Sequence, residues 1–257
     1  MRPDIGKVLR TAQSYFPALK RSKDTFYRVS RRILRKPHEP DFKILPLLDL
    51  GGGSIVDVGA NHGQTIESVR LFRPDAAITS FEANPHLAAT LSARYERDAS
   101  VTIRPVGLSD RSGTFTLYVP SYRGFVYDGL ASLSRDEAFG WLSRETIYGF
   151  DPRHLHLDEV TCSVETLDAQ KLSPSLIKID VQGLEYEVLK GGYDTLREHE
   201  PYVLIEDLAR NARVLELMNG LGYRAYHIVD GRLLPGVGRS ANSLLATVRH
   251  GRALPLP

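Results

Sequence analysis

The stretch Ile55-Val56-Asp57-Val58-Gly59-Ala60-Asn61-His62-Gly63 determines how the rest of the sequence is interpreted. Its first four residues form a short apolar run that is typical of a buried strand, and a segment with helical periodicity follows at 65–72. Glycines in the connecting turn let the backbone approach a ligand closely, and the start of the next helix offers unpaired N–H groups. The stretch therefore predicts a strand, a ligand-binding turn and a helix.

The same alternation continues along the chain. We expect further helices at 85–94 and 184–196, and further strands at 77–81, 101–105, 114–119, 175–179 and 202–205. Strands that alternate with helices indicate βαβ units around a parallel sheet. Segments 223–229 and 243–248 are expected to form a terminal antiparallel pair, with turn residues at Asp230-Gly231. The pattern predicts a doubly wound, Rossmann-like α/β fold with a mostly parallel seven-stranded sheet and a terminal antiparallel strand.

Two segments differ from this pattern. Residues 1–45 are expected to be a basic helical extension, because positions 1–41 carry eleven Lys and Arg against four Asp and Glu, and Pro17 should interrupt any helix there. Residues 46–257 form the main domain, in which the aromatic-rich segment 120–161 fits no period and is expected to be a substrate-loop insertion. The extension's apolar residues at helical spacing are Tyr15, Phe16, Leu19, Phe26, Tyr27, Val29, Ile33 and Leu34, and its basic cluster is Arg28, Arg31, Arg32, Arg35 and Lys36.

Composition excludes several classes of protein. With 42% hydrophobic and 25% charged residues, the 257 residues suit one sizeable globular domain rather than a disordered chain. Cys162 is the single cysteine, so neither an intramolecular disulfide nor a cysteine-based zinc cluster can form. No apolar run approaches the roughly 20 residues of a membrane span, and we expect no secretory signal. A cytoplasmic protein is the expected result.

A carboxylate after the second predicted strand narrows the choice of ligand. Glu82 lies nineteen residues past Gly63, where it can accept hydrogen bonds from both hydroxyls of a ribose. Asn61 occupies the place of the second glycine in the dinucleotide fingerprint, which keeps a pyrophosphate away. Asp57 would repel a phosphate but could bind the ammonium group of a methionine moiety. These features favour S-adenosylmethionine over NAD.

Another predicted strand also ends in a carboxylate. Asp180 follows the apolar run 176–179, and ligands in open α/β sheets collect at the carboxyl ends of the strands, so Asp180 is expected beside the reacting centre. The neighbouring Glu185 is explained equally well as a first-turn charge that the helix dipole favours. A divalent cation could instead bind to the carboxylates of Asp180, Glu206 and Asp207. Nothing else in the sequence supports a metal site, so we assign no metal ligands.

Four motifs in this order resemble the FkbM family of methyltransferases. The similarity spans about Ile55 to Glu206 and implies a class I methyltransferase fold. It also implies S-adenosylmethionine-dependent transfer of a methyl group to a hydroxyl, commonly on a sugar, a glycolipid or a polyketide-like metabolite. The motifs are Val56-Asp57-Val58-Gly59-Ala60-Asn61-His62-Gly63, Phe81-Glu82-Ala83-Asn84-Pro85, Gly107-Leu108-Ser109-Asp110 and Ile177-Lys178-Ile179-Asp180-Val181-Gln182-Gly183-Leu184-Glu185.

The resemblance further implies roles for single residues. Gln182 stands where the family often has Glu, which weakens any proposal of an essential base at that position. Carried over by position, the residues that would surround the methionine end of the cofactor are Asp57, Gly59, Asn61 and Gly63. Glu82 would hold the ribose, and Asn84 lies in the same motif. Leu108 and Ser109 would flank the adenine, and Asp180 would lie below the sulfonium.

Methylation of a hydroxyl also requires a group that takes its proton as the new bond forms. His154 and His156 lie in the predicted insertion, and histidine is the side chain best suited to proton transfer near neutral pH. Together with Asp180 they are the candidate catalytic residues.

Three other functions stay open. An NAD-dependent redox or epimerase enzyme would use a Tyr-x-x-x-Lys pair, a spacing that Tyr186 and Lys190 share. A catalytically inactive, methyltransferase-like protein would bind a partner through the basic extension and the insertion. A nucleic-acid methyltransferase would suit the basic extension, but the chain has no Asn-Pro-Pro-Tyr-type motif for a flipped base.

The expected partner is a small-molecule or carbohydrate-like hydroxyl acceptor, and we do not expect nucleic acid. The basic N-terminus could make peripheral contact with a membrane, because cationic amphipathic helices bind anionic lipid surfaces. The chain could also form homo-oligomers.

Overall fold

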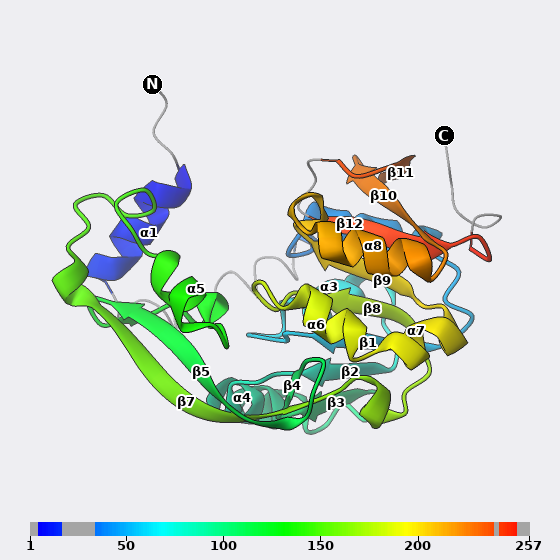
Figure 1. The fold of residues 1–257 in the computed structure, drawn as a ribbon, viewed down its shortest axis with the longest axis horizontal. Coiled ribbons are helices and arrows are strands. Elements are labelled where there is room, and N and C mark those ends of the chain that lie inside the picture. The colour runs from blue at the N-terminus through cyan, green and yellow to red at the C-terminus, as the bar shows by residue number, and fades with distance from the viewer. Residues whose placement is uncertain (1–4, 17–33, 239–241, 251–257) are drawn as a thin grey trace.

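The computed structural model describes residues 5–16, 34–238 and 242–250, and an eight-stranded sheet forms its centre (Figure 1). The strand order is β11-β10-β12-β9-β8-β1-β2-β3, and the strands from β9 to β3 in this order are parallel to one another. The parallel strands are β1 (Ser54–Val58), β2 (Ile78–Phe81), β3 (Val101–Arg104), β8 (Pro174–Ile179) and β9 (Tyr202–Glu206).

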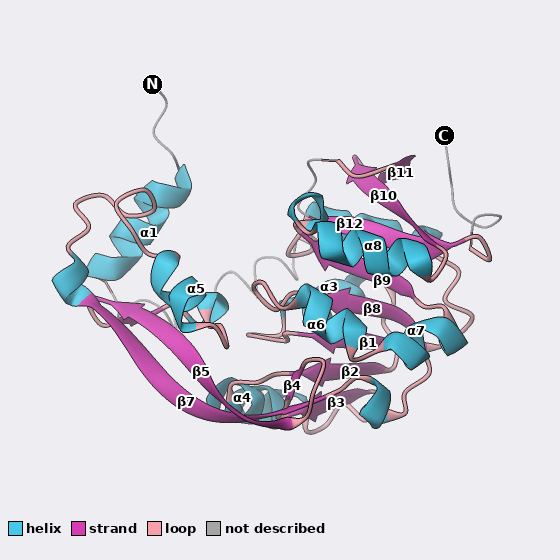
Figure 2. Ribbon diagram, in the orientation of Figure 1, coloured by secondary structure: helices cyan, strands magenta, loops and turns pink. Residues whose placement is uncertain are grey.

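Helices cover both faces of this sheet (Figure 2). Successive strand residues point to opposite faces, so that Leu204 joins one core cluster and Ile205 the other. Because both faces are buried, the central strands are mostly apolar rather than alternating, and the polar residues within them, such as Asp57 and Lys178, are themselves buried. On one face lie α3 (Gln64–Phe72) and α4 (Pro85–Tyr95), and on the other α6 (Glu185–Lys190), α7 (Tyr193–His199) and α8 (Ala212–Gly220).

The C-terminal edge of the sheet contains one strand more than expected. β12 (Asn242–Thr247) lies between β9 and β10 (Tyr223–Val229) and runs antiparallel to both, as the predicted terminal pair requires. The turn at Asp230-Gly231, however, joins β10 to the edge strand β11 (Arg232–Pro235) rather than to β12. The doubly wound α/β fold is confirmed, and β11 makes the sheet eight-stranded instead of seven-stranded.

The helix expected at 184–196 is two helices, α6 and α7, that are separated by Gly191 and Gly192. A side chain at Gly191 would collide with the backbone carbonyl of Ser109. Only glycine, which has no side chain, lets the chain pass this close to Ser109. α6 ends at Lys190, directly before this contact between distant segments.

A second, four-stranded sheet has the order β4-β7-β5-β6. Its long strands β5 (Gly113–Tyr122) and β7 (Leu155–Glu165) pair antiparallel from Gly113 to Tyr122, and in Figure 1 this ribbon leads away from the main sheet. Segment 120–161 is therefore more regular than predicted, since both of its ends are strands. The smaller elements are β4 (Gly107–Leu108), β6 (Phe125–Val126), η3 (Asp128–Leu130), α5 (Arg135–Gly140) and η4 (Pro152–His154).

The ribbon of β5 and β7 buries one face in its first half and the other face in its second half. The alternation of apolar residues in the sequence is therefore interrupted, and it does not predict β7 as one strand. Leu155 at one end packs in a cluster with Tyr122, whereas Cys162 and Val164 at the other end pack in a different cluster. The exposed pair Asp158-Glu159 lies between them and shifts the alternation of apolar residues by one position. A period-two pattern cannot continue through such a change of face.

The N-terminal region divides into two parts. α1 (Ile5–Tyr15) contacts β6 of the second sheet and ends two residues before Pro17. η2 (Pro40–Leu47) crosses the expected domain boundary at 45, and its Ile44 and Leu45 are fully buried in the core of the main sheet. No helix in the described parts of the chain is long and apolar enough to cross a membrane. Of the residues named for the extension, Pro17, Leu19, Phe26, Tyr27, Arg28, Val29, Arg31, Arg32 and Ile33 lie outside the described residues.

Candidate active site

The turn after β1 passes directly against the end of β8. A side chain at Gly59 would collide with the backbone carbonyl of Asp180, and Gly59 has a φ of +89°, which favours glycine further. The amides of Gly59 and Ala60 both donate to the Phe81 carbonyl at 3.0 Å. The first and fourth motifs are therefore in backbone contact, and the end of β2 holds the first motif in place.

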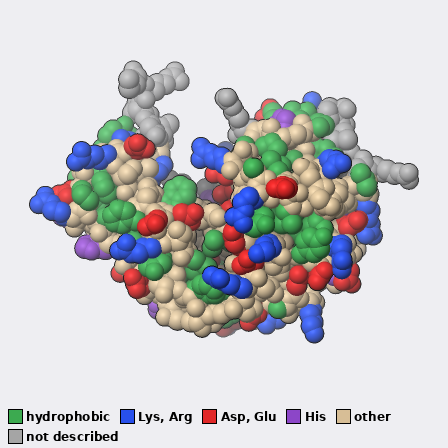
Figure 3. All heavy atoms as spheres, in the orientation of Figure 1, with side chains coloured by type: hydrophobic (Ala, Val, Ile, Leu, Met, Phe, Trp, Pro, Cys, Tyr) green, Lys and Arg blue, Asp and Glu red, His purple; other side chains and the backbone are tan. Residues whose placement is uncertain are grey.

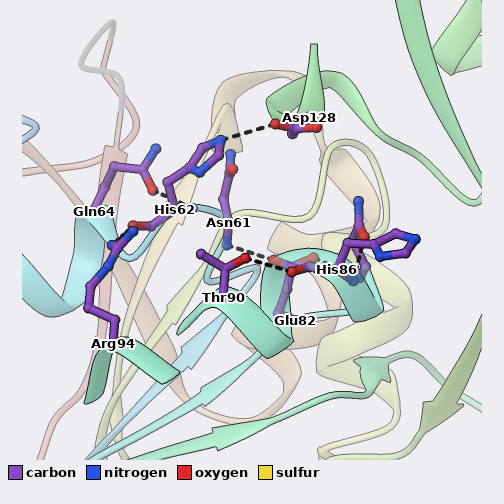
Figure 4. A network of polar contacts seen from close by, with 9 residues as sticks. Asn61, His62, Gln64, Glu82, His86, Thr90, Arg94 and Asp128 are labelled. Carbon is purple, nitrogen blue, oxygen red and sulfur yellow. Dashed lines mark hydrogen bonds and ion pairs between the residues drawn. The ribbon is translucent and has the colours of Figure 1, made fainter. Parts of the chain in front are cut away.

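Glu82 ties the first two motifs together. One carboxylate oxygen, Oε2, accepts a hydrogen bond from the Asn61 amide at 2.6 Å, and Oε1 accepts one from the Asn84 amide at 2.8 Å (Figure 4). The side chain is 8% exposed, and burial raises its pKa while these two backbone donors oppose the increase. A carboxylate oriented by two backbone amides offers its remaining lone pairs in fixed directions.

A cavity lies at the carboxyl ends of β1, β2 and β8, and its empty space, including the part that is open to solvent, is about 720 Å³. Figure 3 shows that the surface is hollowed between the part that contains the main sheet and the part that contains α1 and α5. We call its two sides the sheet wall, formed by Gly59, Asn61, Glu82, Leu108 and Asp180, and the insertion wall, formed by Asp128, Gly129, Ala131, Ser132 and Leu133.

Two side-chain contacts attach the insertion to the main sheet's turns. The first is between His62 Nε2 and Asp128 Oδ2 at 3.1 Å, and Figure 4 shows His62 reaching from the first turn toward Asp128. In the second, Glu137 of α5 accepts a hydrogen bond from the Ser132 hydroxyl at 2.9 Å and lies beside Gly183, where an added Cβ would be 2.6 Å from its carboxylate. The insertion therefore rests on the turns after β1 and β8.

Asp57 does not line the cavity. It is 1% exposed within β1, and its Oδ2 accepts a hydrogen bond from the Ser80 hydroxyl of β2 at 2.9 Å. Desolvation by burial is the main reason that its pKa rises to about 6. In this structure Asp57 links the two strands that carry the cofactor motifs.

Three other predicted cofactor residues also lie behind the cavity surface rather than in it. Gly63 begins α3, and Asn84 caps α4 by accepting a hydrogen bond from the His86 amide at 3.0 Å. Ser109 is 7% exposed, and its amide donates to the Glu165 carbonyl. These residues support the sheet wall, whereas Gly59, Asn61, Glu82, Leu108 and Asp180 form it.

The structure brings neither candidate histidine to the cavity. His154 packs against the ring edge of Tyr122, and the exposed His156 lies opposite Ser121 in the ladder. Leu108 of the sheet wall pairs with Glu165, at the other end of β7. The ribbon thus carries both histidines away from the cavity.

The NAD-type pair is also outside the cavity. Arg213 lies over the ring of Tyr186, 3.7 Å from its centroid, and Lys190 forms an ion pair with Asp110 at 2.8 Å. Neither side chain lines the space where a ligand would bind. Each is explained by a contact with its own neighbours.

Asp180 belongs to a group of three carboxylates. Ligand atoms of Glu39, Asp180 and Glu206 lie within 4.8 Å of one another, so this group could hold a metal ion or share protons. Asp180 also accepts a hydrogen bond from Gln182 Nε2 at 2.8 Å. The pKa of Glu206 is raised to about 7, mainly because the carboxyl group is buried. The negative charges of Asp180 and Glu39 raise this pKa further.

Sequence reasoning missed several members of this site. In the carboxylate group Glu39, and not Asp207, accompanies Asp180 and Glu206. Nothing in the sequence around Glu39, which precedes η2, indicates that it meets β8 and β9. The insertion was expected to bind the substrate, but none of the residues of the insertion wall was named, because a segment that fits no period does not show which of its side chains face a cavity.

The sheet wall fits an aminoacyl nucleoside such as S-adenosylmethionine. The side-chain oxygen of Asn61 is buried and has no hydrogen-bond partner in the described part of the chain, which suits it to accept from a ligand's ammonium group. Glu82 presents a carboxylate to the same cavity, and Leu108 adds an apolar surface. These hydrogen-bond acceptors suit the hydroxyls of a ribose and an ammonium group, and they would repel a phosphate.

The sheet order together with a ligand cavity at the carboxyl ends of β1, β2 and β8 defines a class I methyltransferase-like α/β protein. More specifically, the chain belongs to the FkbM methyltransferase family, because the family model described as "Methyltransferase FkbM domain" matches residues 57–225. The resemblance seen in the sequence motifs is confirmed.

Individual relatives are more distant. The chain is 29% identical over 158 residues to the 2-O-methyltransferase NoeI of Sinorhizobium fredii, a match that covers 60% of this chain and 63% of NoeI. A methyltransferase FkbM from Methylobacillus flagellatus has a TM-score of 0.45 at 17% identity, covering 76% of this chain and 43% of that one. Fibrillarin from Aeropyrum pernix, solved with bound S-adenosyl-L-methionine, has a TM-score of 0.39 at 14% identity, covering 79% and 68%.

Proposed function

We propose that this protein is an S-adenosylmethionine-dependent O-methyltransferase that acts on a hydroxyl of a sugar, glycolipid or polyketide-like metabolite. The observation that carries the proposal is the cavity at the strand ends, which Glu82 and Asp180 both line. Membership of the FkbM family supports methyl transfer, and the 2-O-methyltransferase relative supports oxygen as the acceptor atom.

The sheet wall would bind the cofactor. S-Adenosylmethionine supplies an electrophilic methyl group, so the protein has to align the acceptor and remove its proton. Glu82 would accept hydrogen bonds from the ribose hydroxyls, and Asn61 Oδ1 would accept one from the ammonium group. Leu108 would pack on the adenine. These three contacts explain why the wall combines one carboxylate, one amide and one apolar side chain.

Asp180 is the proposed proton acceptor, because it lines the cavity and its carboxylate meets two others. A hydroxyl that attacks a methyl group must lose its proton as the new C–O bond forms. Glu206, with a pKa raised to about 7, can take up that proton from Asp180 near neutral pH. The insertion wall would then position the acceptor opposite Asp180, with Asp128 and Ser132 as its polar groups.

The test combines binding and transfer. Wild-type protein should bind S-adenosylmethionine in calorimetry and transfer a labelled methyl group to a component of a sugar and glycolipid extract. Glu82→Ala should weaken cofactor binding by roughly 100-fold, since it removes two charge-assisted hydrogen bonds. Glu96→Ala, at an exposed glutamate just after α4, is the control and should bind normally. Absence of binding by the wild type at millimolar cofactor would contradict the proposal.

A further inference from the structure

Lys178 is a charged side chain in the interior of the main sheet. It is 2% exposed within β8, and its ammonium donates a hydrogen bond to the Ile179 carbonyl at 3.3 Å. Of the residues that the structure describes, Lys178 is the one buried Lys or Arg. A buried ammonium is costly unless opposite charges or further hydrogen bonds compensate for its lost hydration. The bond to one carbonyl does not explain why this position holds a lysine.

Carboxylates lie on both sides of Lys178 and on the same face of the sheet. Its partner in the ladder with β1 is Asp57, and adjacent residues of neighbouring strands point to the same face. Its partner on β9 is Leu204, so Glu206, two residues further on, points to this face as well. Burial raises the pKa of both carboxyls, and the charge of Lys178 opposes that increase.

Other acidic groups complete the surroundings of Lys178. Glu39 and Asp180 belong to the same carboxylate group as Glu206. Asn242 of β12 fixes the outer side of this group, because its Nδ2 donates to Glu39 at 2.6 Å and to Asp41 at 3.2 Å. The acidic residues that the neighbouring elements bring to this region are Asp57 of β1, Asp180 after β8, Glu185 of α6, Glu206 of β9, and Glu39 and Asp41 at η2.

We propose that Lys178 is a positioning residue of the active site, whose buried ammonium supplies the positive charge that keeps the group of Glu39, Asp180 and Glu206 able to accept a proton. The proposal rests on the proposed function, because the proton is the one that the acceptor hydroxyl loses to Asp180 as its oxygen bonds the methyl group. Lys178 itself neither donates nor accepts a proton in this step.

The physical reason is repulsion between like charges. Carboxylates that lie close together hold shared protons to higher pH, because they cannot all be ionised at little cost. A group that already holds these protons cannot take another one from a substrate. A positive charge beside the group favours its ionised forms, and the sheet fixes that charge in place at Lys178.

A divalent cation is the alternative source of positive charge. Ligand atoms of the three carboxylates lie within 4.8 Å of one another, and oxygen ligands suit such an ion. A buried ammonium beside the group, however, repels a second cation. We therefore assign the charge balance of this group to Lys178, and the experiment below includes the metal ion as an outcome.

The first test needs neither cofactor nor substrate. Lys178→Met removes the charge and keeps an unbranched side chain of similar length. In NMR titrations of ¹³C-labelled full-length protein, Glu206 should become protonated at a pH about one unit higher in this variant than in the wild type, because a nearby opposite charge is missing. Glu206→Gln identifies the resonance. An unchanged Glu206 titration in Lys178→Met would overturn the proposal.

The matched control is the same substitution at another lysine. Lys190 forms an ion pair with Asp110 and does not line the cavity, so Lys190→Met should leave the titration of Glu206 as it is in the wild type. An equal change in both variants would show that any loss of positive charge has this effect, and would also overturn the proposal.

Methyl transfer gives a second readout. The acid limb of the pH profile of kcat should move to higher pH by about one unit in Lys178→Met, which is a roughly tenfold loss of rate on that limb, while the cofactor Kd stays constant. A merely structural role would lower kcat by the same factor at every pH. Removal of divalent cations with EDTA should leave the wild-type rate unchanged. A rate that EDTA abolishes and Mg²⁺ restores would assign the charge to a metal ion and contradict the proposal.

Failure of this proposal and failure of the proposed function give different results. A wild type that transfers no methyl group would contradict the proposed function, and the Glu206 titration would still decide whether Lys178 balances the carboxylates. If Lys178→Met did not fold, the wild type would decide instead. Its Lys178 side-chain resonances should be those of a charged amine at neutral pH, and those of a neutral amine would overturn the proposal.

Discussion

The two walls of the cavity are built in different ways. The sheet wall consists of strand ends and turns that contact one another through backbone groups, as Gly59 does with Asp180 and Glu82 with two amides. The insertion wall lies in η3 and the loop after it, which pack against the core clusters of the second sheet, and side-chain contacts such as that between His62 and Asp128 attach it to the turns. We infer that changes in the sheet wall affect cofactor binding, folding and chemistry, whereas changes in the insertion wall affect mainly the acceptor.

The largest expected effect is at Asp180. Asp180→Asn should lower kcat by about 100- to 10,000-fold, because general-base catalysis contributes that much and an amide cannot take the proton. Cofactor affinity should change little, since the amide has nearly the shape of the carboxylate. Single-turnover methyl transfer and calorimetry measure the two quantities. Asp207→Asn, which lies outside the carboxylate group, is the control. An unchanged kcat in Asp180→Asn would assign the proton to another group.

Gly59→Ala tests whether backbone contact holds the sheet wall together. The added methyl group collides with the Asp180 carbonyl at a φ of +89°, so the free energy of unfolding should fall by about 3 kcal/mol or more. Gly222→Ala has a similar φ of +84° but open space around it, and should cost about 1 kcal/mol. Urea denaturation measures both. Equal losses would mean that backbone strain, and not the close approach of the two turns, explains Gly59.

Asp57 predicts a pH dependence of stability that belongs to the sheet wall. Its pKa is about 6 in the folded protein against an ordinary value of 3.8, so the folded state binds the proton more tightly than the unfolded state. Its stabilising contribution is therefore complete below about pH 4 and is lost as the pH rises through about 6. Between pH 4 and pH 7.5 the free energy of unfolding should fall in both proteins, and the fall should be about 2 to 3 kcal/mol smaller in Asp57→Asn than in the wild type.

Urea denaturation at the two pH values measures this difference. Asp75→Asn, at an exposed aspartate in the loop before β2, should follow the wild type at both. If Asp57→Asn also followed the wild type, Asp57 would not titrate within this range.

The contact between the walls should give the smallest effect. In a double-mutant cycle of His62→Gln and Asp128→Asn, the coupling energy should be about 0.5 to 1 kcal/mol, because the His62 side chain is 31% exposed and solvent weakens the pair. The acceptor KM should rise a few-fold while the cofactor Kd stays constant. Equal changes in both constants would show that the two walls act as one unit, against the comparison drawn above.

Some parts of the site could be predicted from the sequence, and others could not. Gly59, Asn61, Glu82, Leu108 and Asp180 were all expected at the cofactor site, and all line the cavity. Each of them lies at the end of a strand or in the turn directly after it, at a position that its motif defines. The local sequence is therefore enough to predict them. Ser109 and Gly63 were expected there as well but support the wall from behind, because motif position does not tell which way a residue faces.

The candidate histidines failed to reach the cavity for a related reason. His154 and His156 were chosen for their chemistry and their place in the insertion, but the ribbon of β5 and β7 carries them to its far end. The strand β7 could not be recognised, because the apolar alternation shifts where the ribbon changes its buried face. Such a change depends on what packs on each half of the ribbon.

The sequence by itself determined the family, the parallel sheet and the residues at its strand ends, because the carboxyl ends of parallel strands always meet at one edge. Only the tertiary structure decided which segments meet across long stretches of chain. It brought Glu39 to Asp180 and Glu206, built the insertion wall on a second sheet, and docked α1 by its polar face. These contacts depend on the packing of distant segments, for which a local sequence pattern has no signal.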